Sequence, residues 1–214
     1  WGSVLKPAAF LGLLCFAPSD GQRVRFTRPD RWLDGWSPTA TETAAPELAR
    51  RYLAVYGPAT REDFARWLGA PPALAGRLLR GLAEETVAVE VDGEAATMLS
   101  ADVDELRSSR PAGVVRLLPA FDHLVVAAPR GLLDAELRAR VYRPQGWLSP
   151  VLAVDGAMAG VWRHERRGDA LEVTVEAFAP PVPEAVRAGT EAEAQRLAAF
   201  LGGELDLRWA AVGR

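Results

Sequence analysis

The chain has 214 residues, and with 49% hydrophobic side chains it can bury one large core or two small ones. Its 28 acidic residues outnumber its 25 basic ones, and the formal net charge of −3 argues against a protein that coats nucleic acid without selectivity. Cys15 is the only cysteine, which excludes an internal disulfide and a cysteine-based zinc site, so we expect no metal and a cytoplasmic location. Any contact with DNA must come from a local basic patch.

Almost every positive charge is an arginine, since Lys6 is the only lysine. Guanidinium groups bind phosphates and guanine edges with two hydrogen bonds at once, which suits DNA recognition. GC-rich coding produces the same bias in a sequence rich in Ala, Gly and Pro, and both explanations stay open. The apolar run 8–17 is shorter than the roughly 20 residues that cross a bilayer, so no membrane partner is expected.

Residues 1–40 are interpreted as the end of a preceding winged helix. A short helix with Pro7 in its first turn leads into an apolar strand, and the alternating segment 22–28 predicts a wing after a turn. Arginines in and after this segment are candidates for phosphate contact, although exposed strands also carry arginines for solubility. These candidates are Arg23, Arg25, Arg28 and Arg31. Residues 37–46 are expected to be a linker.

Residues 41–108 have the pattern of a winged helix-turn-helix. Apolar residues at helical spacing predict a first helix over 47–56. Thr60 and Asp63 then have the spacing of a capping box at the start of a second helix, which Gly69 ends. This order of helices is the first half of a compact DNA-binding plan.

A third helix and a hairpin complete that plan. The third helix follows a Pro-Pro turn and carries Arg77 and Arg80, which are further candidates for DNA contact. Alternating segments on either side of Asp92-Gly93 predict the hairpin, or wing. The third helix of such a unit normally lies against the major groove, but winged helices also bind proteins, and both uses stay open.

Residues 109–214 are predicted to form an antiparallel, β-rich domain with a C-terminal helix. Residues 113–128 suggest two buried strands around a turn at Pro119, and residues 129–143 are amphipathic and loosely helical. Three further strands separated by turn signals predict an antiparallel meander, over 150–154, 159–165 and 170–178. The fold class is therefore α+β.

The C-terminal helix and one polar pair complete this domain. Thr190 is predicted as the N-cap of the helix, with Glu193 closing a capping box, and residues 205–209 as one more strand. Asp122 and His123 are the only adjacent ionisable residues in an apolar segment. A buried Asp-His pair could orient an imidazole for proton transfer, but a lone histidine near the end of a strand is more often a structural residue.

Five segments carry a family resemblance: LKPAAFLGLLCF, FTRPDRWL, ARRYLAVYGPATREDFARWLG, RLLPAFDHLV and GWLSPVLAVDGAMAGVW. Read together, they resemble the bacterial winged-helix proteins of the AlkZ/YcaQ type. The resemblance implies tandem winged helices followed by a β-rich region, double-stranded DNA as the partner and no cofactor. Characterised members are DNA glycosylases that excise alkylated bases and unhook interstrand crosslinks, whereas others are known only as DNA-binding proteins.

The catalytic signature of that family is not found in this sequence. The signature is a Gln-apolar-Gln or Gln-apolar-Asp triplet, and none of the three glutamines fits it. Gln22, Gln145 and Gln195 are followed two positions later by Val24, Trp147 and Leu197. The resemblance therefore implies no catalytic residue here, and the chain is expected to begin inside the second winged helix of a longer protein.

Whether the protein is an enzyme stays open on the sequence, with three functions to distinguish. The first is a glycosylase-like repair protein, of which this chain is the C-terminal part, acting on alkylated or crosslinked DNA. The second is a non-catalytic DNA-binding or regulatory protein, and the third is a protein-interaction module.

Overall fold

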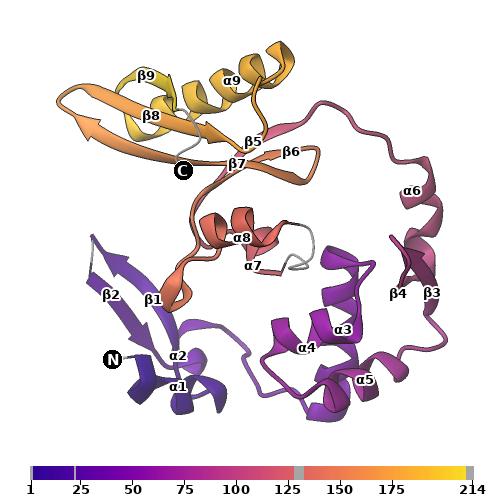
Figure 1. Ribbon diagram of the computed structural model, residues 1–214. Coiled ribbons are helices and arrows are strands. Elements are labelled where there is room, and N and C mark those ends of the chain that lie inside the picture. The colour runs from indigo at the N-terminus through magenta and orange to yellow at the C-terminus, as the bar shows by residue number, and fades with distance from the viewer. Residues whose placement is uncertain (1, 22, 128–132, 211–214) are drawn as a thin grey trace. The chain divides into compact units, whose positions relative to one another are not determined.

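The structure is a computed structural model that describes residues 2–21, 23–127 and 133–210. The chain divides into two compact units, residues 1–48 and 49–214 (Figure 1). No helix in the described ranges is long and apolar enough to cross a membrane.

The N-terminal unit contains a helix, a hairpin and one short helical turn. These elements are α1 (Gly2–Phe10), β1 (Cys15–Asp20), β2 (Arg23–Thr27) and α2 (Pro29–Trp32). The two strands are antiparallel, with Phe16 opposite Phe26 and their ring centroids 5.1 Å apart. A helix and a hairpin are present as expected, but the helix begins at Gly2, so Pro7 lies inside it and not in its first turn. Among residues 3–21 and 23–48 only Pro29 is buried, so this unit has little core of its own.

Three helices and a second hairpin follow in the order predicted. They are α3 (Thr41–Tyr56), α4 (Arg61–Leu68), α5 (Pro72–Arg80), β3 (Thr86–Val91) and β4 (Glu94–Leu99). The linker predicted over 37–46 is wrong in its second half, because α3 begins at Thr41. Pro46 removes one backbone hydrogen bond from this helix, and the burial of Ala49, Tyr52 and Leu53 further along α3 offsets that loss.

Local signals fix both ends of α4. The Thr60 hydroxyl accepts a hydrogen bond from the Asp63 amide at 3.0 Å, and the Asp63 carboxylate accepts one from the Thr60 amide at 3.2 Å. Arg66 donates to the same carboxylate at 2.8 Å. Gly69 ends the helix in the left-handed conformation, with φ of 66°, where a side chain would be strained. The predicted capping box and C-terminal stop are confirmed.

An aromatic core holds these helices together. Tyr52, Leu53 and Phe64 are each at most 2% exposed, and the rings of Tyr52 and Phe64 lie 4.7 Å apart. Trp67 packs against the same tyrosine at 5.1 Å. Burial raises the pKa of Tyr52 to about 12, so its hydroxyl stays protonated. The outward faces of α4 and α5 are left to polar side chains.

From Ser100 onward the chain contains both helices and strands. The helices are α6 (Val103–Ser108), α7 (His123–Ala127), α8 (Ala135–Val141) and α9 (Glu184–Leu201), with single 3-10 turns at Ser100–Asp102 and Pro144–Gly146. The strands are β5 (Val115–Leu118), β6 (Val151–Val154), β7 (Ala157–Arg167), β8 (Ala170–Ala177) and β9 (Glu204–Trp209). The helix predicted over 129–143 is confirmed for its second half, and residues 128–132 lie outside the described residues.

The five strands form one sheet in the order β5-β6-β7-β8-β9 (Figure 1). The meander and the additional last strand are confirmed, and pairings up to β8 are antiparallel. β9 instead pairs with β8 in parallel, because α9 carries the chain back across the sheet before β9 begins. The domain is therefore α+β as predicted, with one parallel pair in a sheet expected to be wholly antiparallel.

The second strand predicted within 113–128 is wrong, because that segment forms α7. The Asp122 carboxylate accepts a hydrogen bond from the Leu124 amide at 2.9 Å, and the Asp122 carbonyl accepts one from the Val126 amide at 2.9 Å. This local capping starts a helix directly after the turn at Pro119. It outweighs the strand preference of Val125 and Val126.

Thr190 does not cap the last helix, which begins at Glu184. Thr190 lies fully buried within α9, and its hydroxyl donates to the Val186 carbonyl at 2.7 Å. The Glu193 carboxylate turns toward the sheet, where it accepts a hydrogen bond from the Leu117 amide at 3.3 Å. The predicted capping box is wrong, because the helix begins more than one turn earlier, Thr190 bonds a carbonyl of an earlier turn, and Glu193 bonds the sheet.

Helix α9 packs against one face of the sheet. Ala194 and Ala198 lie in a core with Leu171, Val173 and other apolar side chains of the sheet. A separate apolar cluster, which includes Val125 of α7, Val141 of α8 and Val151 of β6, covers part of the opposite face. The rest of that opposite face, on β7 to β9, is polar.

We expect Asp63→Ala to lower the free energy of unfolding by about 1–2 kcal/mol at neutral pH, because it removes the capping box. Burial alone acts to raise the pKa of Asp63, but the hydrogen bonds from Thr60 and Arg66 outweigh it and the pKa lies below its ordinary value. A lowered carboxyl pKa contributes stability above the unfolded-state value of about 4 and loses it as the pH falls further. Urea denaturation at several pH values should therefore show the wild type losing its advantage below about pH 4.

Asp104→Ala is the matched control for this experiment. Asp104 lies in the first turn of α6, and its side chain is 97% exposed. Its nearest basic group is Arg107, with 3.8 Å between the Arg107 Nη1 and Asp104 Oδ1 atoms. Its replacement should have little effect at any pH. Equal losses for the two variants would contradict a specific role of the capping box.

We expect Gly189→Ala to destabilise the C-terminal domain by about 1–3 kcal/mol through overpacking. A Cβ atom on Gly189 would lie 2.6 Å from Val115 Cγ2, so α9 and β5 meet too closely for a side chain. Adding Val115→Ala removes the contact with Cγ2 and leaves the one with Val115 Cβ at 2.9 Å, so it relieves part of the clash, and the double variant should lose less stability than the sum of the two single variants. Strictly additive losses in urea denaturation would show that this contact is not close in solution.

Candidate nucleic-acid interface

The exposed face of α5 carries the predicted DNA-contacting arginines of the helical region. Arg77 and Arg80 are exposed, and no carboxylate pairs with either within the described part of the chain. Both lie in the last turn of α5, which begins after the Pro-Pro turn and buries Ala75 and Leu79 on its other side. The helix thus presents two free guanidinium groups to solvent.

Arg61 joins these two arginines, a residue that the sequence analysis did not single out. The Cδ atom of Arg61 lies 3.0 Å, and Arg80 Nη1 3.4 Å, from the position that a Cβ atom on Gly76 would take. Gly76 therefore lets the side chain of Arg61 lie directly over α5. Arg61 also pairs with Glu62 at 2.5 Å, and both side chains are more than half exposed.

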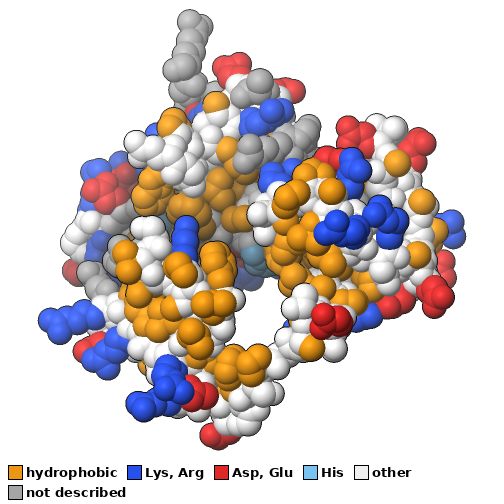
Figure 2. Space-filling model, turned by 90° about the horizontal axis from the view of Figure 1, so that it is seen from below, with side chains coloured by type: hydrophobic (Ala, Val, Ile, Leu, Met, Phe, Trp, Pro, Cys, Tyr) orange, Lys and Arg blue, Asp and Glu red, His pale blue; other side chains and the backbone are white. Residues whose placement is uncertain are grey.

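These three residues, Arg61, Arg77 and Arg80, are called the α5 arginine cluster. Figure 2 shows Lys and Arg side chains gathered on the face seen from below, over the region of α4 and α5. A glycine in the middle of α5 was the only sequence signal for the third member, because it marks a place where another side chain approaches the helix. The cluster has the geometry of a phosphate-binding surface.

The wing that follows α5 has the opposite charge. Glu90, Asp92 and Glu94 are exposed around its turn, and no basic residue lies between Thr86 and Leu99. Asp92 and Gly93 have φ of 51° and 83°, as the tight hairpin turn predicted from the sequence requires. This wing repels phosphates, so it does not extend the basic surface of α5.

The other predicted arginines lie in β2 and at α2 of the N-terminal unit, and two of them are already paired. Arg25 contacts Asp20 at 2.5 Å, and Arg28 donates two hydrogen bonds to Asp30 at 2.9 and 2.6 Å. These bonds lower the pKa of Asp30 and hold it ionised. Because all four side chains are exposed, each pair contributes little to stability, and a phosphate competes readily for the arginines.

Arg23 and Arg31 are exposed and have no carboxylate partner within residues 2–21 and 23–127. The other face of the same hairpin exposes apolar side chains, with Phe16 67% and Val24 48% exposed. Figure 2 shows hydrophobic side chains covering much of this unit on the side seen from below. The N-terminal unit therefore combines two unpaired arginines, Arg23 in β2 and Arg31 in α2, with an apolar surface on the hairpin.

Asp122 and His123 do not form the buried pair that the sequence suggested. His123 is exposed, and its Nδ1 atom lies 3.2 Å from the Tyr56 hydroxyl rather than against Asp122. The Asp122 carboxylate caps α7 instead. The histidine joins α7 to the end of α3, so its observed contact is structural.

The structure thus brings the α5 arginines together with Arg61, and holds Asp122 and His123 apart in separate contacts. Across residues 2–21, 23–127 and 133–210, no group of three or more His, Cys, Asp or Glu side chains is close enough to hold a metal ion. The arrangement can bind anions through guanidinium groups, and it assembles no acid-base pair from the predicted residues.

Comparisons with known proteins give a consistent result. A family model described as DNA glycosylase AlkZ-like matches residues 1–200. An interstrand DNA cross-link repair glycosylase from Streptomyces sahachiroi is 36% identical over 170 residues, which cover 76% of this chain and 46% of that protein. The solved structure of Streptomyces sahachiroi DNA glycosylase AlkZ matches with a TM-score of 0.83 and 33% identity, over 98% of this chain and 58% of that one. The chain spans about half the length of the curated relative it matches.

We expect Arg77→Ala combined with Arg80→Ala to weaken binding to duplex DNA for all sequences alike. If both side chains contact phosphates, the slope of log affinity against log salt should become shallower by about 1.8, or 0.9 for each lost contact. Fluorescence anisotropy with a labelled duplex at several salt concentrations measures this slope.

The matched control removes two arginines from a different surface, Arg107→Ala with Arg110→Ala. Both are exposed in or just after α6, outside the α5 arginine cluster. The control should retain the wild-type slope. If both double variants changed the slope equally, general charge rather than α5 would account for binding.

Proposed function

This chain belongs to the AlkZ-like DNA glycosylase family, as its sequence segments indicated, and from that membership we propose that it binds double-stranded DNA through winged-helix elements and serves in glycosylase repair of alkylated or crosslinked DNA. The relative from Streptomyces sahachiroi is named for interstrand DNA cross-link repair, which supports this substrate class. Under this proposal, the part of the protein described by the structure binds the DNA duplex.

The observation that carries the proposal is the α5 arginine cluster. In helix-turn-helix proteins the corresponding helix lies in the major groove, and exposed arginines there reach both phosphates and guanine edges. Arg77 and Arg80 are exposed and free of carboxylates among the described residues, so no internal ion pair has to break before they bind. Arg23 of β2 and Arg31 of α2, both without a carboxylate partner among the described residues, offer a second surface of the same chemistry.

A second candidate function is duplex binding without base excision. It is favoured by the contacts of Asp122 and His123, because the first caps α7 and the second faces Tyr56. Neither group is placed to act on the other as a proton-transfer pair. A regulator or accessory protein on the same scaffold would need only the arginine surfaces.

One pair of assays on the complete product of the gene separates these functions. Duplex affinity is measured first, and base release is then measured with a duplex carrying one alkylated base and with an interstrand-crosslinked duplex. Released bases leave abasic sites, which alkali converts to strand breaks. Binding with strand breaks is expected for a repair glycosylase. Binding without breaks leaves the non-catalytic candidate, and a lack of salt-sensitive binding contradicts both.

A further inference from the structure

An open cleft of about 410 Å³ lies between the C-terminal end of α8 and strands β7 and β8. Its polar lining consists of Arg140, Arg143, Ser149, Arg163, Thr174 and Glu176. The three arginines come from separate parts of the chain: the last turn of α8, the segment after it and the middle of β7. One carboxylate accompanies them, so the lining carries two positive charges in excess.

Arg140 is the inner member of this group. Its side chain is 21% exposed, and its Nη2 atom pairs with the carboxylate of Glu176. Its Nη1 atom is buried and has no hydrogen-bond partner within the described residues. The guanidinium plane also lies over the ring of Phe178, 5.5 Å from its centroid. Buried donors are nearly always satisfied, so this nitrogen needs an acceptor that the described chain does not supply.

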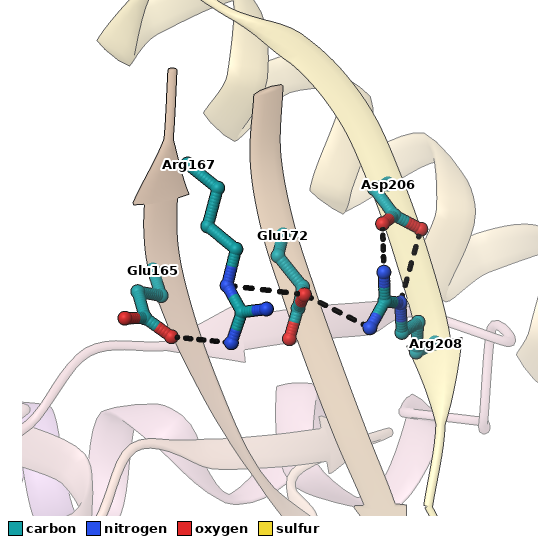
Figure 3. Close-up of polar contacts among 5 residues, drawn as sticks. All are labelled: Glu165, Arg167, Glu172, Asp206 and Arg208. Carbon is teal, nitrogen blue, oxygen red and sulfur yellow. Dashed lines mark hydrogen bonds and ion pairs between the residues drawn. The ribbon is translucent and has the colours of Figure 1, made fainter. Parts of the chain in front are cut away.

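Arg143 and Arg163 form the outer part of the cleft. Both are exposed, and no ion pair joins either of them to a carboxylate among residues 2–21, 23–127 and 133–210. Other arginines on the same face of the sheet differ in this respect. Figure 3 shows Arg167 and Arg208 held by three carboxylates, those of Glu165, Glu172 and Asp206.

This face of the sheet has two regions, one in which carboxylates neutralise the arginines and one, at the cleft, in which arginines are in excess. Glu172 is 8% exposed and lies 3.0 Å from Arg208 and 3.6 Å from Arg167, so it neutralises both neighbours. The network is therefore closed to a further anion. At the cleft, one carboxylate faces three arginines, so two guanidinium groups remain available.

We propose that this cleft is a phosphate-binding site for a phosphate group of the DNA backbone. Guanidinium forks match the oxygens of a phosphate and form charge-assisted hydrogen bonds with them. Arg140 Nη1 supplies a buried donor at the site, and Arg143 and Arg163 supply the exposed charge that draws the anion in. The inference rests on the proposed function for the choice of DNA as the source of the phosphate. It adds a contact in the β-rich domain, outside the helices and hairpins.

Two variants test the cleft without unfolding it. Arg143→Ala with Arg163→Ala removes the two exposed charges and breaks no ion pair of the described residues. Arg140→Lys keeps a positive charge beside Glu176 but loses the planar fork. Arg107→Ala with Arg110→Ala again controls for loss of net charge. Circular dichroism and urea denaturation check that all of these proteins are folded.

Duplex binding is the first measurement. Relative to the control, the Arg143/Arg163 double variant should bind a duplex roughly tenfold more weakly, with a salt slope shallower by about 1.8. Arg140→Lys should show a smaller loss, because the charge remains. The inference is overturned if the wild type binds duplex DNA and the Arg143/Arg163 double variant binds it as tightly as the control does. The proposed function would then remain intact.

Inorganic phosphate and a deoxynucleoside 5′-monophosphate, followed by NMR of the arginine Nε–H groups, distinguish the possible sources. We expect phosphate to shift the signals of Arg140, Arg143 and Arg163 saturably, and duplex DNA to shift the same signals. A preference for the mononucleotide, with no effect of duplex, would overturn the DNA backbone as the source. If the wild type binds no duplex, the proposed function fails, and this titration then decides the cleft alone: saturable shifts support a phosphate site, and their absence overturns it.

Discussion

The close approach of α9 to the sheet is the constraint on which the C-terminal domain depends. Gly189 leaves no room for a side chain against Val115, and the small residues Ala194 and Ala198 continue the contact. Helix α9 crosses that face and brings the chain back to the start of β8. The next strand, β9, therefore pairs with β8 in parallel. The opposite face is then shared between the apolar cluster under α7 and α8 and the exposed polar strands. Both the arginine-carboxylate network and the cleft lie on this second face.

Charge pairing decides which arginines are available in a protein that is acidic as a whole. Many arginines of this chain are held by nearby carboxylates, as Arg50 is by Glu85 and Arg208 by Asp206. The hairpin of β3 and β4 carries further negative charge on Glu90, Asp92 and Glu94. What remains for an anion is therefore a small set of arginines whose neighbours do not neutralise them. Net charge reports none of this, since it sums over paired and unpaired groups alike.

The contacts of Asp122 and His123 bear on whether these residues could transfer protons. The family to which the chain belongs contains glycosylases, yet the polar residues that looked suitable for proton transfer have structural contacts here. The histidine faces a tyrosine of α3, and the aspartate begins a helix. Exposed arginines without a carboxylate partner among the described residues, by contrast, recur in three places: the N-terminal unit, α5 and the cleft beside α8. The proposed binding of DNA rests on these arginines.

The sequence by itself determined the features that depend on contacts within a few residues. The capping box of Thr60 and Asp63, the stop at Gly69 and the Asp92-Gly93 turn were all predicted, because each interaction closes within one turn of chain. Tertiary structure alone decided the rest. Glu193 left its expected capping role for the sheet, and Arg140 found Glu176 across 36 residues. Partners so distant in sequence meet only after the helices and sheet have packed, so no local pattern encodes them.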